Sequence, residues 1–329
     1  MRRLIVVYNP NSSQYFQVKK DILSRLTDIE GFMVGKFAIE KTNFEANVAR
    51  LIKVLKDDDL ILAAGGDATA AVAANAILDS KKDAHLTVLP YGNFNDLART
   101  LKTKKLEDVL EIDRAGDGLG RVPAEHPKGG AAGGKSPAGP ARNSLLYPLD
   151  IIVDGQHWRY ATCYVTIGMT AEAVSIYNQP KMRQKLKKSF GRKISSYTEL
   201  MNWYFKNRHR HIFLPDFKLN GKQQPKKTSD YAAVNGRSMA RVMKGREDYK
   251  KPRTFRSETE RTVSFPKLFM LMTKSIFYRV PGKDTKGDTL EFLEPATVML
   301  QAEGESQVFN NVKKIEIKKG DRCLKVIEN

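Results

Sequence analysis

Short apolar runs alternate with longer amphipathic stretches over about the first 110 residues of the chain. Uninterrupted apolar runs of four to eight residues are typical of strands buried on both faces, and apolar residues at helical spacing indicate helices. The runs expected as strands are 3–8, 34–40, 60–64 and 86–90, and the stretches expected as helices are 16–30, 43–55, 65–78 and 97–111. This alternation predicts a parallel sheet with crossover helices, and therefore an α/β domain over residues 1–114.

A glycine- and proline-rich segment interrupts this pattern. Residues 115–140 contain eight Gly and four Pro and almost no large apolar side chains. Such a composition cannot bury enough surface to offset its ordering entropy, so residues 115–143 are expected to form a flexible linker or loop. Residues 129–136 also match the phosphate-binding pattern G-x-x-x-x-G-K-S. Neither a strand nor a helix flanks this match, so we attribute it to chance.

Residues 144–329 follow a different pattern. Short segments rich in β-branched and aromatic residues, each closed by a Gly turn, are typical of antiparallel strands. We therefore expect a mainly antiparallel β-sandwich as a second domain, whose last strands can return to the first domain. Helical interruptions are expected near 179–207 and 265–278.

The charge of the chain is unevenly distributed. The chain has 56 Lys and Arg against 37 Asp and Glu, a formal net charge of +19. Residues 181–286 alone hold 28 basic and 8 acidic residues, a net of +20, so the remainder has a net of −1. A localised positive field implies an anionic partner, namely nucleic acid, an anionic membrane surface or a phosphorylated substrate. The alternative is a solvated face with excess Lys.

Composition excludes several classes of protein. With 41% apolar residues, the chain is neither disordered nor collagen-like. No apolar stretch approaches the roughly 18 residues of a membrane span, and the N-terminal apolar run is too short for a signal peptide. Two cysteines, Cys163 and Cys323, make no disulfide framework and are typical of a reducing cytoplasm.

Two loops that follow predicted strands carry the candidate chemistry. The first, GGDAT at 65–69, joins a strand to a helix, at the edge where open α/β sheets bind ligands. Its glycines allow the backbone to approach a phosphate, and the helix N-terminus offers free N–H groups. Asp67 beside a phosphate indicates a metal ion or proton handling. Asp67 as a plain helix N-cap is an equally good interpretation.

The second loop, PYGNFNDLAR at 90–99, follows the next strand and should lie beside the first on the same sheet edge. Asn95 and Asp96 in this loop could cap the following helix, orient Asp67 or reach a nucleotide. Either loop alone is ordinary, and their coincidence is what makes this edge a candidate site.

These loops, together with NPNS at 9–12, resemble the diacylglycerol kinase catalytic family, which includes sphingosine kinases and bacterial lipid kinases. The family patterns are N-P-x-S, G-G-D-G-T and P-x-G-T-x-N-D-x-A-R, in this order. Beyond the glycine-rich segment, LDI at 149–151, YVTIG at 164–168 and QAEGE at 301–305 resemble later family segments. The resemblance implies a diacylglycerol-kinase-like (NAD-kinase-like) α/β domain followed by a β domain.

The resemblance also implies an ATP- and magnesium-dependent lipid kinase. Asp67 would serve catalysis or magnesium, with Asp96 and Asp150 in supporting positions. The residues implied for nucleotide binding are Asn9, Ser12, Gly65, Gly66, Thr69, Gly92, Asn93, Asn95 and Glu305.

Several positions depart from the family pattern. Ala68 replaces a glycine, so a positive φ at this position would be strained. Asn93 replaces threonine, and Glu303 replaces aspartate. Met169-Thr170 stands where the family often has an aromatic residue and an Asp.

The family's Asp-Asp-Gly segment, which supplies a base, is missing from residues 252–260. Glu258 is the candidate replacement, because a carboxylate can accept the hydroxyl proton; a solvated charge is an equally good interpretation. Either the acceptor differs from the family's or catalysis is weaker.

The expected function is a cytoplasmic kinase that docks peripherally on an anionic membrane and phosphorylates diacylglycerol or a related lipid. The patch expected to dock consists of Lys185, Lys187, Lys188, Arg192 and Lys193. One alternative is a catalytically weakened homologue that binds nucleotide or anionic lipid. The other is nucleic-acid binding through 181–286, for which no recognisable motif is present. The sequence leaves the oligomeric state open, a homodimer included.

Overall fold

The computed structural model describes residues 1–29, 31–41, 43–103, 106–107, 142–179, 202, 213–239, 243–260 and 282–328. The chain divides into two compact units. Unit 1 consists of Met1–Tyr147 with Asp321–Asn329, and unit 2 consists of Pro148–Gly320. The expected linker (115–143) and the expected helices at 179–207 and 265–278 fall almost entirely outside the described residues.

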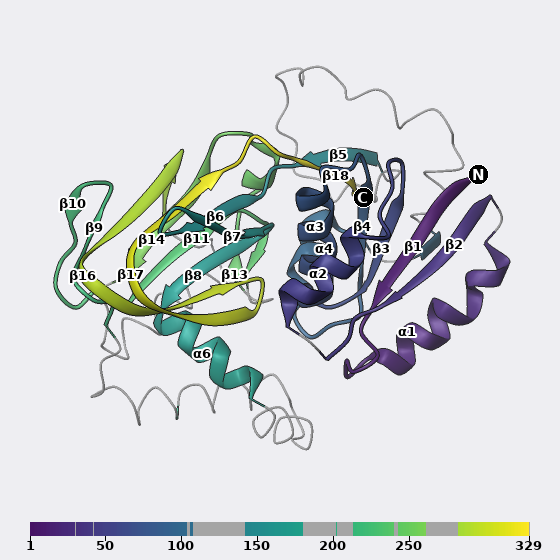
Figure 1. Ribbon diagram of the computed structural model, residues 1–329, viewed down its shortest axis with the longest axis horizontal. Coiled ribbons are helices and arrows are strands. Elements are labelled where there is room, and N and C mark those ends of the chain that lie inside the picture. Colours follow the sequence, from purple (N-terminus) through teal and green to yellow (C-terminus); the bar gives the residue numbers. More distant parts are fainter. Residues whose placement is uncertain are drawn as a thin grey trace, which may run out of the picture. The chain divides into compact units, whose positions relative to one another are not determined.

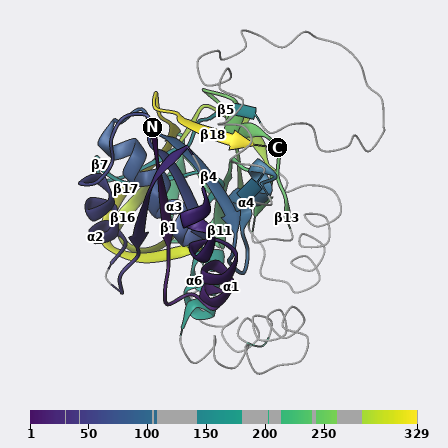
Figure 2. The ribbon, with the colours of Figure 1, turned by 90° about the vertical axis from the view of Figure 1, so that its right-hand side faces the viewer.

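Unit 1 is built on a six-stranded, mostly parallel sheet with strand order β2-β1-β3-β4-β18-β5 (Figure 1). Its strands are β1 (Arg2–Tyr8), β2 (Phe32–Ala38), β3 (Leu60–Gly65), β4 (His85–Pro90), β5 (Arg142–Leu146) and β18 (Leu324–Glu328). All neighbouring pairs are parallel except β18 with β5, which lie side by side in Figure 2. The carboxyl ends of β1, β3 and β4 therefore share one edge of the sheet.

The helices of unit 1 follow the predicted amphipathic stretches. They are α1 (Tyr15–Asp21), the 3-10 helix η1 (Leu23–Asp28), α2 (Phe44–Ile52), α3 (Asp67–Ser80) and α4 (Asp96–Leu101). The Asn43 side chain accepts a hydrogen bond from the Ala46 amide and caps α2, as its residue type favours. The alanine-rich α3 is buried from Thr69 to Leu78, which is why no single face of it is polar.

Two helices differ from the sequence prediction. The stretch 16–30 forms two short helices, α1 and η1, rather than one. The stretch 97–111 is helical only as far as Leu101, because Lys102 adopts a left-handed conformation with φ of 60° and its N–H turns back to Ala98 and Arg99. Leu106 and Glu107 are helical again, and residues 108–111 lie outside the described part.

Unit 2 is a mainly antiparallel sheet with strand order β15-β14-β11-β8-β16-β17-β6-β7, to which β9 and β10 add a short ribbon beside β16. Its strands are β6 (Leu149–Val153), β7 (Gln156–Ala161), β8 (Tyr164–Gly168), β9 (Phe217–Leu219), β10 (Lys222–Gln223), β11 (Asp230–Val234), β14 (Phe255–Glu260), β15 (Lys283–Thr285), β16 (Gly287–Ala302) and β17 (Glu305–Lys319). A separate pair, β12 (Ser238–Met239) and β13 (Met243–Lys244), precedes the 3-10 helix η2 (Asp248–Lys250). The expected antiparallel β architecture is confirmed.

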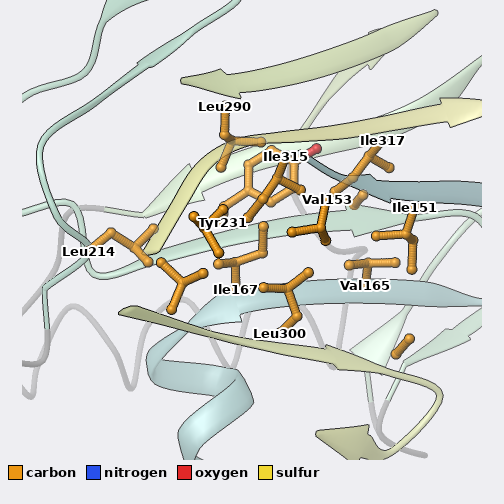
Figure 3. Close-up of a cluster of buried hydrophobic side chains, with 14 of the residues drawn as sticks. Ile151, Val153, Val165, Ile167, Leu214, Tyr231, Leu290, Leu300, Ile315 and Ile317 are labelled. Atoms are coloured by element: carbon orange, nitrogen blue, oxygen red, sulfur yellow. The ribbon is translucent and has the colours of Figure 1, made fainter. Parts of the chain in front are cut away.

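The core of unit 2 lies inside a sheet that bends over itself (Figure 3). Register shifts between Glu291 and Val298 interrupt the pairing of β16 with β17. Such bulges bend a strand. Leu290 and Leu300, from the two halves of β16, therefore reach the same buried cluster from opposite sides, with Tyr231 fully buried between them. A helix that the sequence did not indicate, α6 (Met169–Asn178), follows β8 directly. None of the described helices is long and apolar enough to cross a membrane.

Candidate functional site

The candidate site of unit 1 lies where β1, β3 and β4 end. The backbone N–H of Tyr91, after β4, donates to the carbonyl of Gly65 at the end of β3 (3.0 Å). The Gln14 side chain, shortly after β1, donates to the carbonyl of Gly92 (3.0 Å). Hydrogen bonds therefore join the loops after β3 and β4 to each other and to the chain just after the NPNS turn.

Gly66 and Gly92 are in direct contact, backbone to backbone. A Cβ on Gly92 would overlap the Cα of Gly66 and lie 2.8 Å from Oδ1 of Asn95. A Cβ on Gly66 would lie 3.1 Å from the Cα of Gly92. The motif predicted that these glycines allow a phosphate to approach, but in the structure they are first required for the packing of one loop on the other.

Gly65 has a similar steric requirement within its own loop. A Cβ at this position would lie 2.6 Å from the Cβ of Thr69 and overlap its hydroxyl. Thr69 is itself buried in the first turn of α3. The predicted GGDAT motif is thus a close-packed turn, in which glycine and threonine fit only as a pair.

Asp67 joins the two loops through its carboxylate. Oδ2 accepts the N–H of Asn95 (2.9 Å), and Oδ1 accepts those of Asp96 (2.6 Å) and Leu97 (3.4 Å). These are the first amides of α4, which have no partner within that helix. Asp67 therefore caps α4, not its own helix; the N-cap of α3 is Gly66, without a side-chain bond. The carboxylate is held firmly at the edge of the sheet.

Asn95 fixes the shape of the second loop. It adopts a left-handed conformation with φ of 57°, which Asn tolerates better than most residues. Its side chain accepts the N–H of Gly92 (2.7 Å) and donates to the carbonyl of the same residue (2.8 Å). Asp96 begins α4 and is fully buried, whereas Asn93 is exposed.

The loop after β1 is a compact turn. The side-chain oxygen of Asn9 accepts the N–H of Asn11 (2.8 Å), and its carbonyl accepts the N–H of Ser12 (3.1 Å). Both Asn9 and Ser12 are partly exposed, as nucleotide-binding groups need to be.

Ala68 is not strained. It lies in the first turn of α3 and has no positive φ, so alanine is accommodated where the family pattern has glycine. The expected penalty at this position is therefore absent.

The predicted site residues of unit 2 lie on three different strands. Glu258, in β14 opposite Ala232, is half-buried; burial, and then the charge of Glu260, raise its pKa. Asp150, in β6, contacts the ring of His157 (Nδ1 to Oδ1, 2.7 Å). Glu305 begins β17 and is partly buried.

The lysines and arginine of the predicted membrane patch lie outside the described residues, as does the G-x-x-x-x-G-K-S match at 129–136. The roles that the sequence assigned to individual residues stay predictions.

Comparison with known proteins locates the similarity. Residues 3–119 match the family model of the diacylglycerol kinase catalytic domain. The resemblance to this family is confirmed. A diacylglycerol kinase of Bacillus subtilis (strain 168) is 33% identical over 113 residues, which are 34% of this chain and 36% of that protein. A diacylglycerol kinase of Staphylococcus epidermidis is 33% identical over 105 residues, 30% of this chain and 32% of that protein.

The fold extends the similarity to the whole chain. A crystal structure of a diacylglycerol kinase from Bacillus anthracis str. Sterne aligns with a TM-score of 0.63 at 14% identity, covering 100% of this chain and 97% of that one. The sequence match to the curated diacylglycerol kinases, in contrast, spans only about a third of their length. The sequence match thus lies within unit 1, and unit 2 shares its fold with the solved structure.

Asp67 is a carboxylate in the cluster that is suited to magnesium. Mg²⁺ is commonly held by one or two carboxylates, waters and substrate phosphates rather than by an all-protein cage. Within the described ranges there is no group of three His, Cys, Asp or Glu side chains that could hold a metal. A carboxylate oxygen has two lone-pair directions, so Oδ2 of Asp67 can accept the Asn95 amide and also share an ion.

The sequence did not indicate Gln14, and it did not indicate the contact that Glu303 makes. Gln14 lies in no motif, and only the fold brings it to Gly92. Glu303 is buried, with Oε1 accepting the N–H groups of Cys163 (2.5 Å) and Tyr164 (3.4 Å). Its place in the QAEGE segment was the one available signal, and that signal did not reveal this contact.

Proposed function

We propose that this protein is an ATP- and magnesium-dependent lipid kinase that transfers the γ-phosphate of ATP to a hydroxyl of diacylglycerol or a related lipid. The observation that supports this most strongly is the close-packed loop cluster of unit 1, which lies within the residues that match the diacylglycerol kinase catalytic domain. Phosphoryl transfer requires mainly positioning and charge neutralisation, and a rigid cluster of loops supplies positioning.

In this proposal the cluster holds the phosphates of ATP. The turn at Asn9 to Ser12 and the loops at Gly65 and Gly92 lie at one sheet edge, where Asn9 and Ser12 keep partly exposed polar side chains. Asp67, fixed by three amides of α4, keeps its carboxylate in a constant position there. Magnesium, when bound, would neutralise phosphate charge beside Asp67.

Glu258 is the group we propose as the base that accepts the proton of the lipid hydroxyl. Burial raises its pKa, and a carboxylate with a raised pKa is the stronger proton acceptor once it is ionised. Its position in β14 holds it on a rigid element, as a base needs.

A lipid substrate requires the enzyme to reach a membrane. Residues 181–193 contain seven Lys and Arg, which would attract anionic headgroups. We propose peripheral docking through Lys185, Lys187, Lys188, Arg192 and Lys193. Loss of binding to vesicles that contain anionic lipid, when these five are replaced by Gln, would support this docking, and unchanged binding would exclude it.

The kinase activity is tested with purified protein, labelled ATP, Mg²⁺ and mixed micelles of diacylglycerol or other lipid alcohols. We expect a labelled phospholipid and a loss of about 100-fold or more in turnover for Asp67→Asn. Asp57→Asn is the matched control, because Asp57 also accepts a backbone N–H through its carboxylate but lies away from the loops. Thermal melting of both variants separates lost chemistry from lost folding.

Two results would argue against this mechanism. Full activity in Asp67→Asn would exclude the role of Asp67. ATP binding without turnover on any lipid alcohol would favour the alternative of a non-catalytic homologue, which the structural use of the Asp67 carboxylate as a helix cap makes worth testing.

A further inference from the structure

Unit 2 contains an open cavity that the proposed kinase reaction does not use. Its volume is about 520 Å³, which is within the range of small-molecule sites. The residues that line it are Arg237, Lys244, Gly245, Arg246, Glu247, Asp248 and Lys251. Six of these seven are charged and none is a large apolar residue, so a ligand for this cavity is itself charged.

Short-range packing builds one side of the cavity. The N–H of Gly245 donates to the carbonyl of Arg237 (2.8 Å). A Cβ on Gly245 would overlap the carbonyl oxygen of Gly236. The chain before β12 and the chain after β13 can therefore approach only because position 245 is glycine, and this approach brings Arg237 close to Lys244 and Arg246.

The opposite side is anchored to the core. Tyr249 is fully buried, and its N–H donates to the carbonyl of Asn235 (2.7 Å). The partly buried Lys319 amine donates to the carbonyls of Asp248 and Lys251 (2.8 Å for Lys251). The backbone around the cavity is thus held by the fold before any ligand arrives.

The charge of the lining is positive. Four cationic side chains face two acidic ones, a net formal charge of +2. The acids also hold two of the cations in place: Glu247 pairs with Arg237, and Asp248 pairs with Lys251 at 2.8 Å. A phosphomonoester carries about −1.5 to −2 at neutral pH, which complements this lining.

Arg246 keeps a donor that the described residues leave unsatisfied. Its Nε is buried and has no hydrogen-bond partner among the described residues. Its ion pair with Asp284 is 3.8 Å long, beyond hydrogen-bond distance. A buried donor without an acceptor is unfavourable, and the planar guanidinium matches the oxygens of a phosphate.

The cavity lies at the end of unit 2 that carries Glu305. The N–H groups of Asn235 and Gly236 donate to the carbonyl of Cys163 (2.7 and 2.9 Å), and the N–H of Cys163 donates to Glu303. The chain that leads into the cavity is therefore two hydrogen bonds away from the turn between β16 and β17.

We propose that this cavity is a binding site for a phosphate group, carried by a phospholipid headgroup or by a nucleotide. A neutral diacylglycerol acceptor does not need such a site, so the proposal goes beyond the kinase reaction and does not depend on it. Arg246 and Lys244 are the residues that contact the phosphate oxygens.

Binding of the full chain tests the proposal without any measurement of turnover. Inorganic phosphate and ATP are titrated by calorimetry, and vesicles of phosphatidylcholine containing either phosphatidic acid or phosphatidylserine, at equal surface charge, are used in co-sedimentation. Preference for phosphatidic acid assigns the phosphate to a lipid. Binding of ATP that Arg246→Gln weakens, without that preference, assigns it to a nucleotide, because ATP held by the loop cluster of unit 1 would not depend on Arg246.

Arg246→Gln should weaken binding of the preferred probe about 10-fold or more, since charge-assisted hydrogen bonds are lost. Arg253→Gln is the matched control: Arg253 is exposed, lies in the same basic stretch, does not line the cavity and carries the same charge. Its effect should stay within about twofold, as for a single distant surface charge. Lys244→Gln provides a second cavity variant, and thermal melting checks that all three fold.

Equal losses of affinity in Arg246→Gln and Arg253→Gln would overturn the proposal. Binding would then depend only on the overall positive charge of the basic region. Failure of all four probes to bind at millimolar concentration would overturn it as well. Absence of kinase activity would leave it standing, because no probe needs to be turned over.

Discussion

The two units of this protein differ in how strictly their structures restrict the residue type at each position. In unit 1, Gly65, Gly66 and Gly92 lie where a Cβ would meet a neighbour, and Asp67 accepts three amides of another element. Few residue types meet such demands. In unit 2, the sheet is specified by apolar residues facing a core, which many sequences satisfy. The family model matches residues 3–119, whereas unit 2 shares its fold with a solved structure at 14% identity.

This difference indicates where new specificity can arise. Backbone contact between loops in unit 1 leaves little room for change without loss of the site. The ends of the strands in unit 2 can carry a different set of charges without disturbing the core, and the cationic cavity is an instance.

The largest expected effect is that of Gly92→Ala. The new methyl group would overlap the backbone of Gly66 and separate the two loops, at a cost of about 3 kcal/mol or more in unfolding free energy. Urea denaturation measures the loss. Gly35→Ala in β2 is the control, since its Cβ would find its nearest neighbour at 3.8 Å, and it should cost less than about 1 kcal/mol. Similar losses of unfolding free energy in both variants would mean that the contact between Gly66 and Gly92 imposes no particular requirement for glycine.

The next effect concerns a buried acid in unit 2. Burial is the main cause that raises the pKa of Asp230 to about 7, against the hydrogen bonds from Thr170, which lower it. From pH 5 to pH 7 the folded state keeps a proton that the unfolded state has already released, so stability falls as pH rises. Two pKa units correspond to about 3 kcal/mol at most.

The variant Asp230→Asn should remove this pH dependence. Its unfolding free energy relative to the wild type should therefore rise by up to about 3 kcal/mol from pH 5 to pH 8, as measured by urea denaturation at both pH values. Asp67→Asn in unit 1 should behave in the opposite way at pH 8 and lose stability, because the amide-bound carboxylate is stabilising there. A loss of stability in Asp230→Asn that is the same at pH 5 and pH 8 would contradict the titration of Asp230.

A smaller effect is expected at the turn of unit 2. Glu303→Gln keeps one oxygen for the N–H of Cys163 but removes the charge and buries an added NH₂ group, at a cost of about 2 kcal/mol. Thermal denaturation measures it. Glu294, exposed on β16, provides the control Glu294→Gln, which should change stability by less than about 0.5 kcal/mol. If the two variants had the same melting temperature, the Glu303 contact would add nothing to the stability of the turn.

The smallest effect is that of Tyr91→Phe, which removes the hydrogen bond from the Tyr91 hydroxyl to Asp21 (3.2 Å). We expect a loss of about 1 kcal/mol in a melting experiment. Spectroscopic titration offers a second readout, because burial and then Asp21 raise the pKa of Tyr91 to about 12. Tyr15→Phe, for which no comparable hydroxyl bond is present in the described part of the chain, should be near neutral; an equal loss there would show that the bond to Asp21 contributes little.

The sequence alone predicted most of the fold, because hydrophobic period is a local property. Runs at 3–8, 60–64 and 86–90 became β1, β3 and β4 within a residue or two, and the Ala-rich stretch became α3. It missed α6, which directly follows the fully buried β8, and it extended the helix after β4 past Lys102. Both errors arise where the backbone changes direction, because the hydrophobic periodicity of the sequence does not indicate such a change.

The sequence by itself also predicted which loops lie close together, since parallel strands place their carboxyl ends at one edge of the sheet. Tertiary structure decided what the residues in those loops do. Gly92 faces the backbone of Gly66, Asp67 caps a helix that begins 29 residues later, and Gly245 closes a cavity between Arg237 and Arg246. These contacts join residues distant in sequence, and only the packing of the chain determines which polar group meets which donor.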